Sequence, residues 1–363
     1  MEHLQLDAGW REKFVAFLGG EAEIERKARE FKAFRRTRGV RSALDLVRLA
    51  LMYGPGGLSL RALAAAAEAD GVAHISDPAA FERLRKAADF LEALCRDALG
   101  LRAERPVEGE AAKPRPLRLV DASRLEGPQD RCWRLHMAYD PCAARIVEAR
   151  ITPTKMGESL GRFDPQHGDI VIADRGYAQP EGLRRVVEAG ADVIVRVTWN
   201  SLKLTDAQDR PLDWLALFER ARSRQTLELP VFVRKSRGRF RPLPVRLLLV
   251  KKPREAAEKA RSQALRASQK DQRKRVDKRT LESAEFLMLV TSLPVEEFAL
   301  DRVADLYRLR WQIELAFKRL KSLLHIDQLP AKSDEMARTW LHAHLLFALY
   351  TGHLQDVLDV FSP

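Results

Sequence analysis

The sequence predicts an α/β protein in which a mixed β-sheet follows an all-helical N-terminal part. Residues 1 to about 105 consist almost wholly of helical patterns, and residues 117 to 152 hold three strand-like runs separated by short turns. A strand–helix–strand pattern then follows between residues 169 and 199. Closely spaced strands favour antiparallel pairing, whereas strands joined through a helix favour parallel pairing. The two patterns together predict a single sheet of mixed type.

The size and charge of the chain narrow its possible functions. With 363 residues it can hold two or three domains and a sizeable core. It carries 63 Lys and Arg against 51 Asp and Glu, for a formal net charge of +12. Such an excess favours a polyanionic partner, most simply DNA or RNA, with an anionic membrane surface as the alternative.

Apolar patterning and cysteine usage argue against the membrane alternative. No apolar run reaches the roughly 18 residues that a membrane span needs, and the first residues lack the apolar core of a signal peptide. The three cysteines are widely spaced and never form a CxxC motif, which fits a reducing compartment. We therefore predict a cytoplasmic protein with no membrane partner.

Residues 1–110 are predicted to form a helical domain. An amphipathic segment at 41–53 is broken by a Gly-Pro-Gly-Gly sequence, after which Ser59 caps a helix that ends at Gly71. A further helix, capped by Ser76 or Asp77, is expected to continue through residue 99. This arrangement predicts short helices joined by tight connections.

Basic side chains suggest a function for this helical domain. The last of its predicted helices carries Arg83, Arg85 and Lys86, and with the helix before it resembles a helix-turn-helix DNA reader. Small helical bundles with no DNA role share this outline. We favour the first interpretation, an N-terminal all-helical DNA-binding domain.

The strands that follow predict the core. After a linker rich in Pro and charge at 106–116, strands are expected at 117–123, 132–140, 144–152, 168–174 and 191–199, with a helix at 181–190 before the last. A meander of three strands followed by a βαβ unit is the start of a ribonuclease-H-like mixed sheet. We predict a core made of residues 111–197 and 285–333.

Residues 198–284 lose this regular pattern and are predicted to form a basic, β-rich insertion. It holds a predicted hairpin, and residues 251–279 then contain twelve Lys or Arg against four acids, an excess of eight positive charges. Such a run is either a disordered solvated stretch or a basic arm that contacts DNA phosphates, and we favour the arm. A strand then returns the chain to the core, and residues 334–363 are predicted to form a C-terminal helix.

Residues 301 to 324 read as one amphipathic helix with two stripes. At about 100° per residue, Tyr307, Arg310, Glu314 and Lys321 project from the same side. The apolar stripe lies about a quarter-turn away, so the helix can bury one face and hold a carboxylate between cationic groups at its rim. The alternative is a solvated helix face with incidental charges.

Three carboxylates complete the candidate site. Asp121 and Asp174 each close a buried apolar run, and acids that end strands are exposed where sites in α/β folds are built. Either Asp alone is better explained as a turn or cap residue. Together with Glu314, however, they supply oxygen ligands that suit Mg²⁺, or Mn²⁺ as a substitute. Two such ions can activate a water or a 3′-hydroxyl for in-line attack on a phosphodiester.

Three motifs resemble those of a known family. The sequences DxS at 121–123, ADRGY at 173–177 and YxxRxxxExxxxxxK at 307–321 are similar to those of DDE transposases of the insertion-sequence-four family. The last spacing matches that family's YREK signature at all four positions. The resemblance spans most of the chain and includes GESL at 157–160.

The resemblance implies roles for these residues and partners for the chain. Asp121, Asp174 and Glu314 would be the catalytic metal ligands. Tyr307, Arg310 and Lys321 would hold a DNA phosphate, for which Arg offers two parallel donors and Lys a point charge. The family cuts double-stranded DNA at inverted-repeat ends and joins them to target DNA, typically through a hairpin intermediate and a homodimeric synaptic complex.

Competing interpretations follow from the same residues. A non-catalytic DNA-binding repressor derived from a transposase is one, and a ribonuclease-H-fold nuclease that cuts without joining is another. Trp199 at the start of the insertion could stack on a flipped base, although a packing role is favoured. Arg175 and Gly176 are expected to shape the loop after Asp174.

Overall fold

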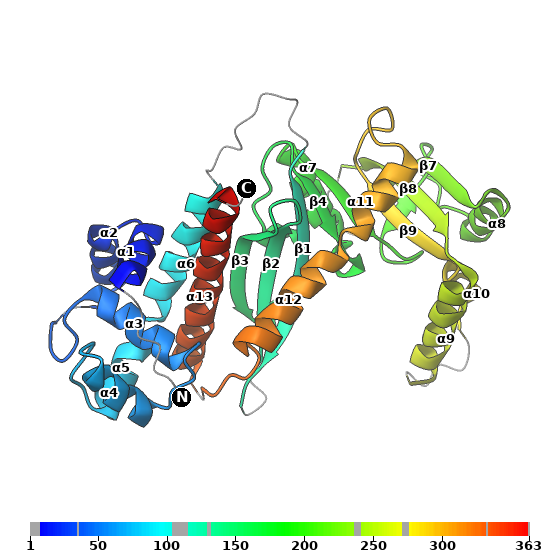
Figure 1. The fold of residues 1–363 in the computed structure, drawn as a ribbon. Coiled ribbons are helices and arrows are strands. Elements are labelled where there is room, and N and C mark those ends of the chain that lie inside the picture. The colour runs from blue at the N-terminus through cyan, green and yellow to red at the C-terminus, as the bar shows by residue number, and fades with distance from the viewer. Residues whose placement is uncertain are drawn as a thin grey trace.

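A computed structural model describes residues 8–34, 36–103, 115–128, 132–235, 241–270, 276–331 and 333–361. Within these residues a nine-stranded mixed sheet runs through the molecule, with a helical cluster at one end and two projecting helices at the other (Figure 1). The mixed α/β class is confirmed, and the sheet is consistent with a ribonuclease-H-like core. Of the predicted linker at 106–116, residues 106–114 lie outside the described residues.

Within the described residues six helices form the N-terminal part, and the predicted limits of the fourth are confirmed. Ser59 caps the fourth helix by accepting a hydrogen bond from the backbone N–H of Ala62, and Gly71 just beyond its end has a φ of +64°. The bounds are α1 (Ala8–Phe17), α2 (Glu21–Glu30), α3 (Ala43–Tyr53), α4 (Leu60–Ala69), α5 (Asp77–Arg85) and α6 (Ala88–Ala103).

The prediction of one helix from residue 77 to residue 99 is wrong. The chain ends α5 at Arg85 and starts α6 at Ala88, with the N–H of Ala87 bonded to the carbonyl of Leu84 in a tight turn. Leu84, Ala87 and Ala88 are all buried. Tertiary burial on both sides of the turn stabilises a change of direction that the local sequence pattern did not signal.

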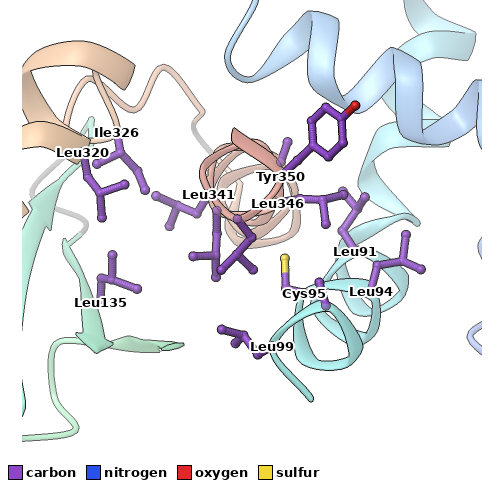
Figure 2. Close-up of a cluster of buried hydrophobic side chains, with 14 of the residues drawn as sticks. Leu91, Leu94, Cys95, Leu99, Leu135, Leu320, Ile326, Leu341, Leu346 and Tyr350 are labelled. Atoms are coloured by element: carbon purple, nitrogen blue, oxygen red, sulfur yellow. The ribbon is translucent and has the colours of Figure 1, made fainter. Parts of the chain in front are cut away.

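The C-terminal helix α13 (Asp334–Phe361) lies between the helical part and the sheet, as Figure 1 shows. Figure 2 shows α6 side chains facing α13 on one side, and Leu320, Ile326 and Leu135 on the other. The Thr339 hydroxyl also donates to the carbonyl of Leu84 at 2.7 Å. Since burying one Leu contributes about 2 kcal/mol, this cluster ties residues distant in sequence into one core.

The sheet has the strand order β3-β2-β1-β4-β5-β9-β8-β7-β6. The first three strands form the predicted antiparallel meander, and β1, β4 and β5 run parallel, with α7 (Pro180–Glu188) as the crossover. The bounds are β1 (Leu117–Glu126), β2 (Cys132–Asp140), β3 (Arg145–Pro153), β4 (Ile170–Ala173), β5 (Asp192–Arg196), β6 (Lys203–Thr205), β7 (Thr226–Arg234), β8 (Leu243–Lys251) and β9 (Phe286–Thr291).

Both faces of the central strands are covered. All four residues of β4 are buried, with Ile170 and Ile172 in the cluster that includes α12 and α13 and Val171 and Ala173 in a second cluster on the opposite face. This burial explains the continuous apolar run IVIA, because a strand covered on both sides needs no polar alternation.

The insertion strands continue the same sheet, since β9 pairs antiparallel with both β5 and β8. The predicted hairpin is present as β7 and β8. The basic run is largely helical, as α9 (Arg254–Lys270) and α10 (Lys278–Ser283), with residues 271–275 outside the described residues. Arg222 on α8 (Trp214–Arg224) bonds Glu282 and Glu285, which anchors α10, while α9 projects from the molecule (Figure 1).

The predicted helix at 301–324 is two helices, which corrects the sequence interpretation. Helix α11 (Leu300–Arg308) ends before Leu309 and Arg310, and α12 (Trp311–Leu324) begins after them. The N–H groups of Arg310 and Ile313 bond carbonyls three residues back, which tightens the joint. The apolar stripe still faces the core, where Ile313, Phe317 and Leu320 are buried. No helix in the described ranges is long and apolar enough to cross a membrane.

Three buried histidines give the stability of the fold a pH dependence. His136, His342 and His344 are at most 3% exposed, and burial lowers the pKa of each to about 4. The unfolded chain has histidine pKa values near 6.5. Between about pH 6.5 and 4 it therefore binds more protons than the native state, and stability is lost as the pH falls through this window.

Replacing His344 with Gln should make the protein less sensitive to acid. We expect the difference in unfolding free energy between pH 7 and pH 5 to shrink by about 1–2 kcal/mol, because one buried group no longer has to gain a proton. Urea denaturation at the two pH values measures this difference. The exposed His167→Gln variant is the control. An unaltered difference in the His344 variant would contradict the assignment.

Candidate active site

The register of two strands brings the predicted aspartates together. Val120 of β1 pairs with Ala173 of the parallel strand β4, so Asp121 and Asp174 each follow a paired residue. Asp121 ends the apolar run but not the strand, since β1 continues to Glu126, beyond the predicted end at residue 123. Asp121 lies next to the point where β4 stops. From Asp121 onward, β1 continues and its pairing is with β2.

The Asp121 carboxyl group lies in a crowded, half-buried environment. Its Oδ1 accepts a hydrogen bond from the N–H of Ala122 at 2.8 Å. Burial raises the pKa of Asp121 to about 6, against the lowering effects of that hydrogen bond and of Arg310. The negative charges of Glu158 and Asp174 raise it further. A cation at this position would relieve the repulsion between these carboxylates.

Asp174 is held by groups from two neighbouring elements. It precedes the short helix η2 (Arg175–Tyr177), and its Oδ1 accepts a long hydrogen bond of 3.4 Å from the hydroxyl of Tyr307 on α11. Arg196 at the end of β5 has its Nη1 3.8 Å from the same oxygen. Burial and the charge of Asp174 raise the pKa of Tyr307 to about 12, so its phenol remains a donor at neutral pH.

Arg310 links the remaining acid to this pair. Its Nη2 is 2.5 Å from Oε1 of Glu314, and its Nη1 is 3.9 Å from Oδ2 of Asp121. The Arg310 side chain is 17% exposed. Because it lies at the joint between α11 and α12, Arg310 reaches β1 while Glu314 sits one turn further along α12. Arg310 therefore joins two of the three predicted acids, and the charge of the third, Asp174, also acts on it.

Lys321 completes the row at the far end of α12. Its Nζ donates to the backbone carbonyl of Arg124 on β1 at 3.2 Å. Tyr307, Arg310 and Lys321 thus all contact residues at the ends of β4 or along β1. The predicted polar stripe is present, although two helices carry it.

The acids are gathered without forming a closed set of ligands. Among the residues that the structure describes, no group of three His, Cys, Asp or Glu side chains is close enough to hold a metal ion directly. Glu314 does not join such a group because its carboxylate is bonded to the Arg310 guanidinium. The donor set of hard carboxylate oxygens nevertheless matches what Mg²⁺ or Mn²⁺ prefers.

Two charged residues of the site were missed by sequence reasoning. Arg196 follows Val195, which pairs with Ala173, so the register that places Asp174 also places Arg196. Its signal in the sequence is its position. Like Asp121 and Asp174, Arg196 is a charged residue that directly follows a buried apolar run. Glu158 acts electrostatically on Asp121 although it comes from the loop after β3. Its only signal was the GESL motif.

Trp199 has the contacts of a packing residue. Its indole N–H donates to the Thr280 hydroxyl at 3.0 Å, and the Arg279 guanidinium carbon lies 3.8 Å from the ring centroid. The side chain also packs against the second core cluster. These contacts join the start of the insertion to α10, and the cation on the ring face contributes about 1 kcal/mol.

The basic residues of the helical part have mixed surroundings. The Arg83 guanidinium donates to the backbone carbonyls of Arg36 and Arg38 at 2.8 and 2.9 Å, so it holds the α2–α3 loop in place. Arg85 pairs with Glu82. Beside them lies a hollow of about 740 Å³ whose lining includes Lys32, Arg36, Arg38 and Lys86. This basic hollow is a candidate phosphate-contacting surface.

Comparison with known proteins places the chain in a family. A model described as the transposase DDE domain matches residues 112–350, the range that carries the three acids and the stripe. The chain therefore belongs to the family of transposase DDE domains, and the resemblance found in the sequence is confirmed. Domains of this family use divalent metal ions.

Individual relatives match nearly the whole chain. The putative transposase InsL for insertion sequence element IS186A of Escherichia coli K12 is 40% identical over 355 residues, covering 96% of this chain and 95% of that protein. The transposase for insertion sequence element IS421 of Escherichia coli is 40% identical over 356 residues, with the same coverage. A more distant relative, the transposase for insertion sequence element IS1151 of Clostridium perfringens, is 25% identical over 200 residues, 51% of this chain and 41% of that protein.

Proposed function

We propose that this chain is a DNA transposase that cuts at the inverted-repeat ends of an insertion sequence and joins them to target DNA. The observation that carries the proposal is the adjacency of Asp121 and Asp174 on parallel strands, with Arg310 linking Asp121 to Glu314. Membership of the transposase DDE family supports it, as do relatives that are named as transposases for insertion sequence elements.

The catalytic acids would hold divalent ions. Asp121, Asp174 and Glu314 are the proposed ligands of Mg²⁺, with Mn²⁺ as a substitute and two ions in the working site. When bound, the ions supply charge stabilisation to the reacting phosphodiester and activation of the attacking oxygen. The crowding of Asp121 by Glu158 and Asp174, which raises its pKa, supports a cation at this position.

Arg310 and its neighbours would bind the phosphate of the transposon end. A guanidinium that already bonds the Glu314 carboxylate has the same fork of donors for a phosphate. We propose that a DNA phosphate takes over this fork and leaves the Glu314 carboxylate available to metal. Tyr307 and Lys321 would contact the same backbone, Tyr307 as a neutral donor and Lys321 as a point charge.

The remaining segments would bind other parts of the DNA. We propose that residues 1–110 bind the transposon end, with the basic hollow beside α5 as the contact surface. The insertion, residues 198–284, would contact phosphates through the exposed cations of α9. Residues 111–197 and 285–333 would form the catalytic core and 334–363 the C-terminal helix. A homodimer would hold two ends together, and cleavage would pass through a hairpin intermediate.

Glu314→Gln should abolish cleavage while leaving end binding within about threefold of the parent. The amide keeps the size of the side chain but removes a metal ligand, so we expect cutting to fall by about 10³-fold or more. Cleavage of labelled DNA carrying the terminal repeats, with Mg²⁺ or Mn²⁺, measures this. The exposed Glu296→Gln variant is the control.

The same assay separates the competing functions. Parental cutting rates in the Glu314 variant would remove this residue from the mechanism. A wild-type protein that binds ends but never cuts them is the transposase-derived repressor. One that cuts but yields no joined product in a strand-transfer assay is a nuclease of the same fold.

Lys321→Ala should weaken the binding of end DNA by about the same factor whatever the base sequence of that DNA. Loss of one phosphate contact is expected to reduce the slope of log affinity against log salt by about 1. Titrations of labelled end DNA at several salt concentrations give that slope. Lys318→Ala removes an exposed cation from the same helix and should leave the slope nearly unchanged. Equal effects of the two substitutions would show that Lys321 acts only through net charge.

A further inference from the structure

A fourth carboxylate lies next to the proposed metal ligands. Glu158 comes from the loop between β3 and the short helix η1 (Leu160–Arg162), and it is partly buried. Its negative charge raises the pKa of Asp121, as that of Asp174 does, so both carboxylates lie within electrostatic reach of Asp121. Neither the three-acid motif nor the YREK stripe includes it.

Gly176 makes room for this carboxylate. A Cβ atom built on Gly176 would lie 2.4 Å from Oε2 of Glu158, far inside contact distance. The φ of Gly176 is not in the left-handed region, so its backbone conformation does not require glycine. The absence of a side chain therefore lets Glu158 lie directly over the loop that follows Asp174. A side chain at this position would displace the Glu158 carboxylate.

The backbone at Glu158 is fixed to that same loop. The Gln179 side-chain amide donates to the carbonyl of Glu158 at 2.7 Å and to the carbonyl of Gly176 at 3.2 Å. Next to it, Leu160 packs so closely on Gly182 of α7 that a Cβ there would lie 3.1 Å from the Leu160 Cβ. The β3–η1 loop is thus clamped to the segment between Asp174 and α7, and Glu158 is held in place.

Tyr177 provides an independent sign that something binds here. Its side chain is fully buried, and its hydroxyl has no hydrogen-bond partner within the described part of the chain. Burial and then the charges of Asp121 and Glu158 raise the pKa of this phenol, so the hydroxyl lies near both acids. A buried hydroxyl left without a partner costs about 1–3 kcal/mol. A water or hydrated ion between the two carboxylates would satisfy it.

We propose that Glu158 is a positioning residue of the metal site, which together with Tyr177 binds the water ligands of the divalent cation held at Asp121. The inference rests on the proposed function. While Glu314 is bonded to Arg310, no three acids in the described part of the chain are close enough to hold an ion directly, and a contact through water reaches further than a direct one. Mg²⁺ keeps several of its waters when proteins bind it, so such a contact suits this ion.

Binding of Mn²⁺ alone to the full chain tests the role of Glu158 without reference to activity. Free Mn²⁺ is measured by electron paramagnetic resonance during titration. We expect Glu158→Gln to weaken binding by about tenfold, the lower end of the range for residues that hold metal ligands in place. Glu158→Asp should restore part of the affinity. Glu181→Gln, which removes an exposed acid from the start of α7, is the matched control and should bind like the parent.

A second variant protects the test against a folding defect. Gly176→Ala leaves the Glu158 carboxylate in the chain but pushes it aside, and it should reproduce the loss of Mn²⁺ affinity. Thermal melting and circular dichroism confirm that each variant is folded. Agreement between Glu158→Gln and Gly176→Ala would support the placement of the carboxylate.

The outcomes separate the role of Glu158 from the proposed function. If Asp121→Asn loses Mn²⁺ binding while folded Glu158→Gln and Gly176→Ala retain parental affinity, the role of Glu158 is overturned and the metal-dependent function stands. If Asp121→Asn also binds Mn²⁺ like the parent, the proposed metal site itself fails.

Discussion

The parallel pairing of β1 with β4 is the constraint on which the site depends. It sets Val120 opposite Ala173 and therefore places Asp121 and Asp174 side by side, although 53 positions separate them in the chain. The next pairing, between β4 and β5, adds Arg196 to the same edge. Since the side chains of a strand alternate between faces, a slip of one residue would point these groups to opposite sides of the sheet. Burial of β4 on both faces opposes such a slip.

The helices across this edge add the cationic half of the site. The joint between α11 and α12 leaves Tyr307 facing Asp174 and brings Arg310 between Asp121 and Glu314. A half-buried guanidinium among acids offsets repulsion that would otherwise destabilise the fold. Bound divalent cations would offset the repulsion among the same acids. The stability of the fold without metal and the proposed affinity for metal would thus depend on the same group of charges.

The N-terminal helices and the sheet form one packed body through α13. This helix contacts α6 and α3 on one side and the region of β2 and α12 on the other, so the two ends of the chain meet in one core (Figures 1 and 2). The basic hollow beside α5 and the basic helix α9 lie at opposite ends of the molecule.

Local signals in the sequence determined the elements and the identity of the acids. Alternating and continuous apolar runs gave the strands, Ser59 and Gly71 gave the limits of a helix, and the spacing from Tyr307 to Lys321 gave the polar stripe, because these features depend on neighbours in the chain. Tertiary structure alone decided the breaks at Ala87 and Arg310, the continuation of β1 past Asp121, and the approach of Glu158 to Asp121. Each of these depends on burial or contact between segments far apart in sequence, which no local period records.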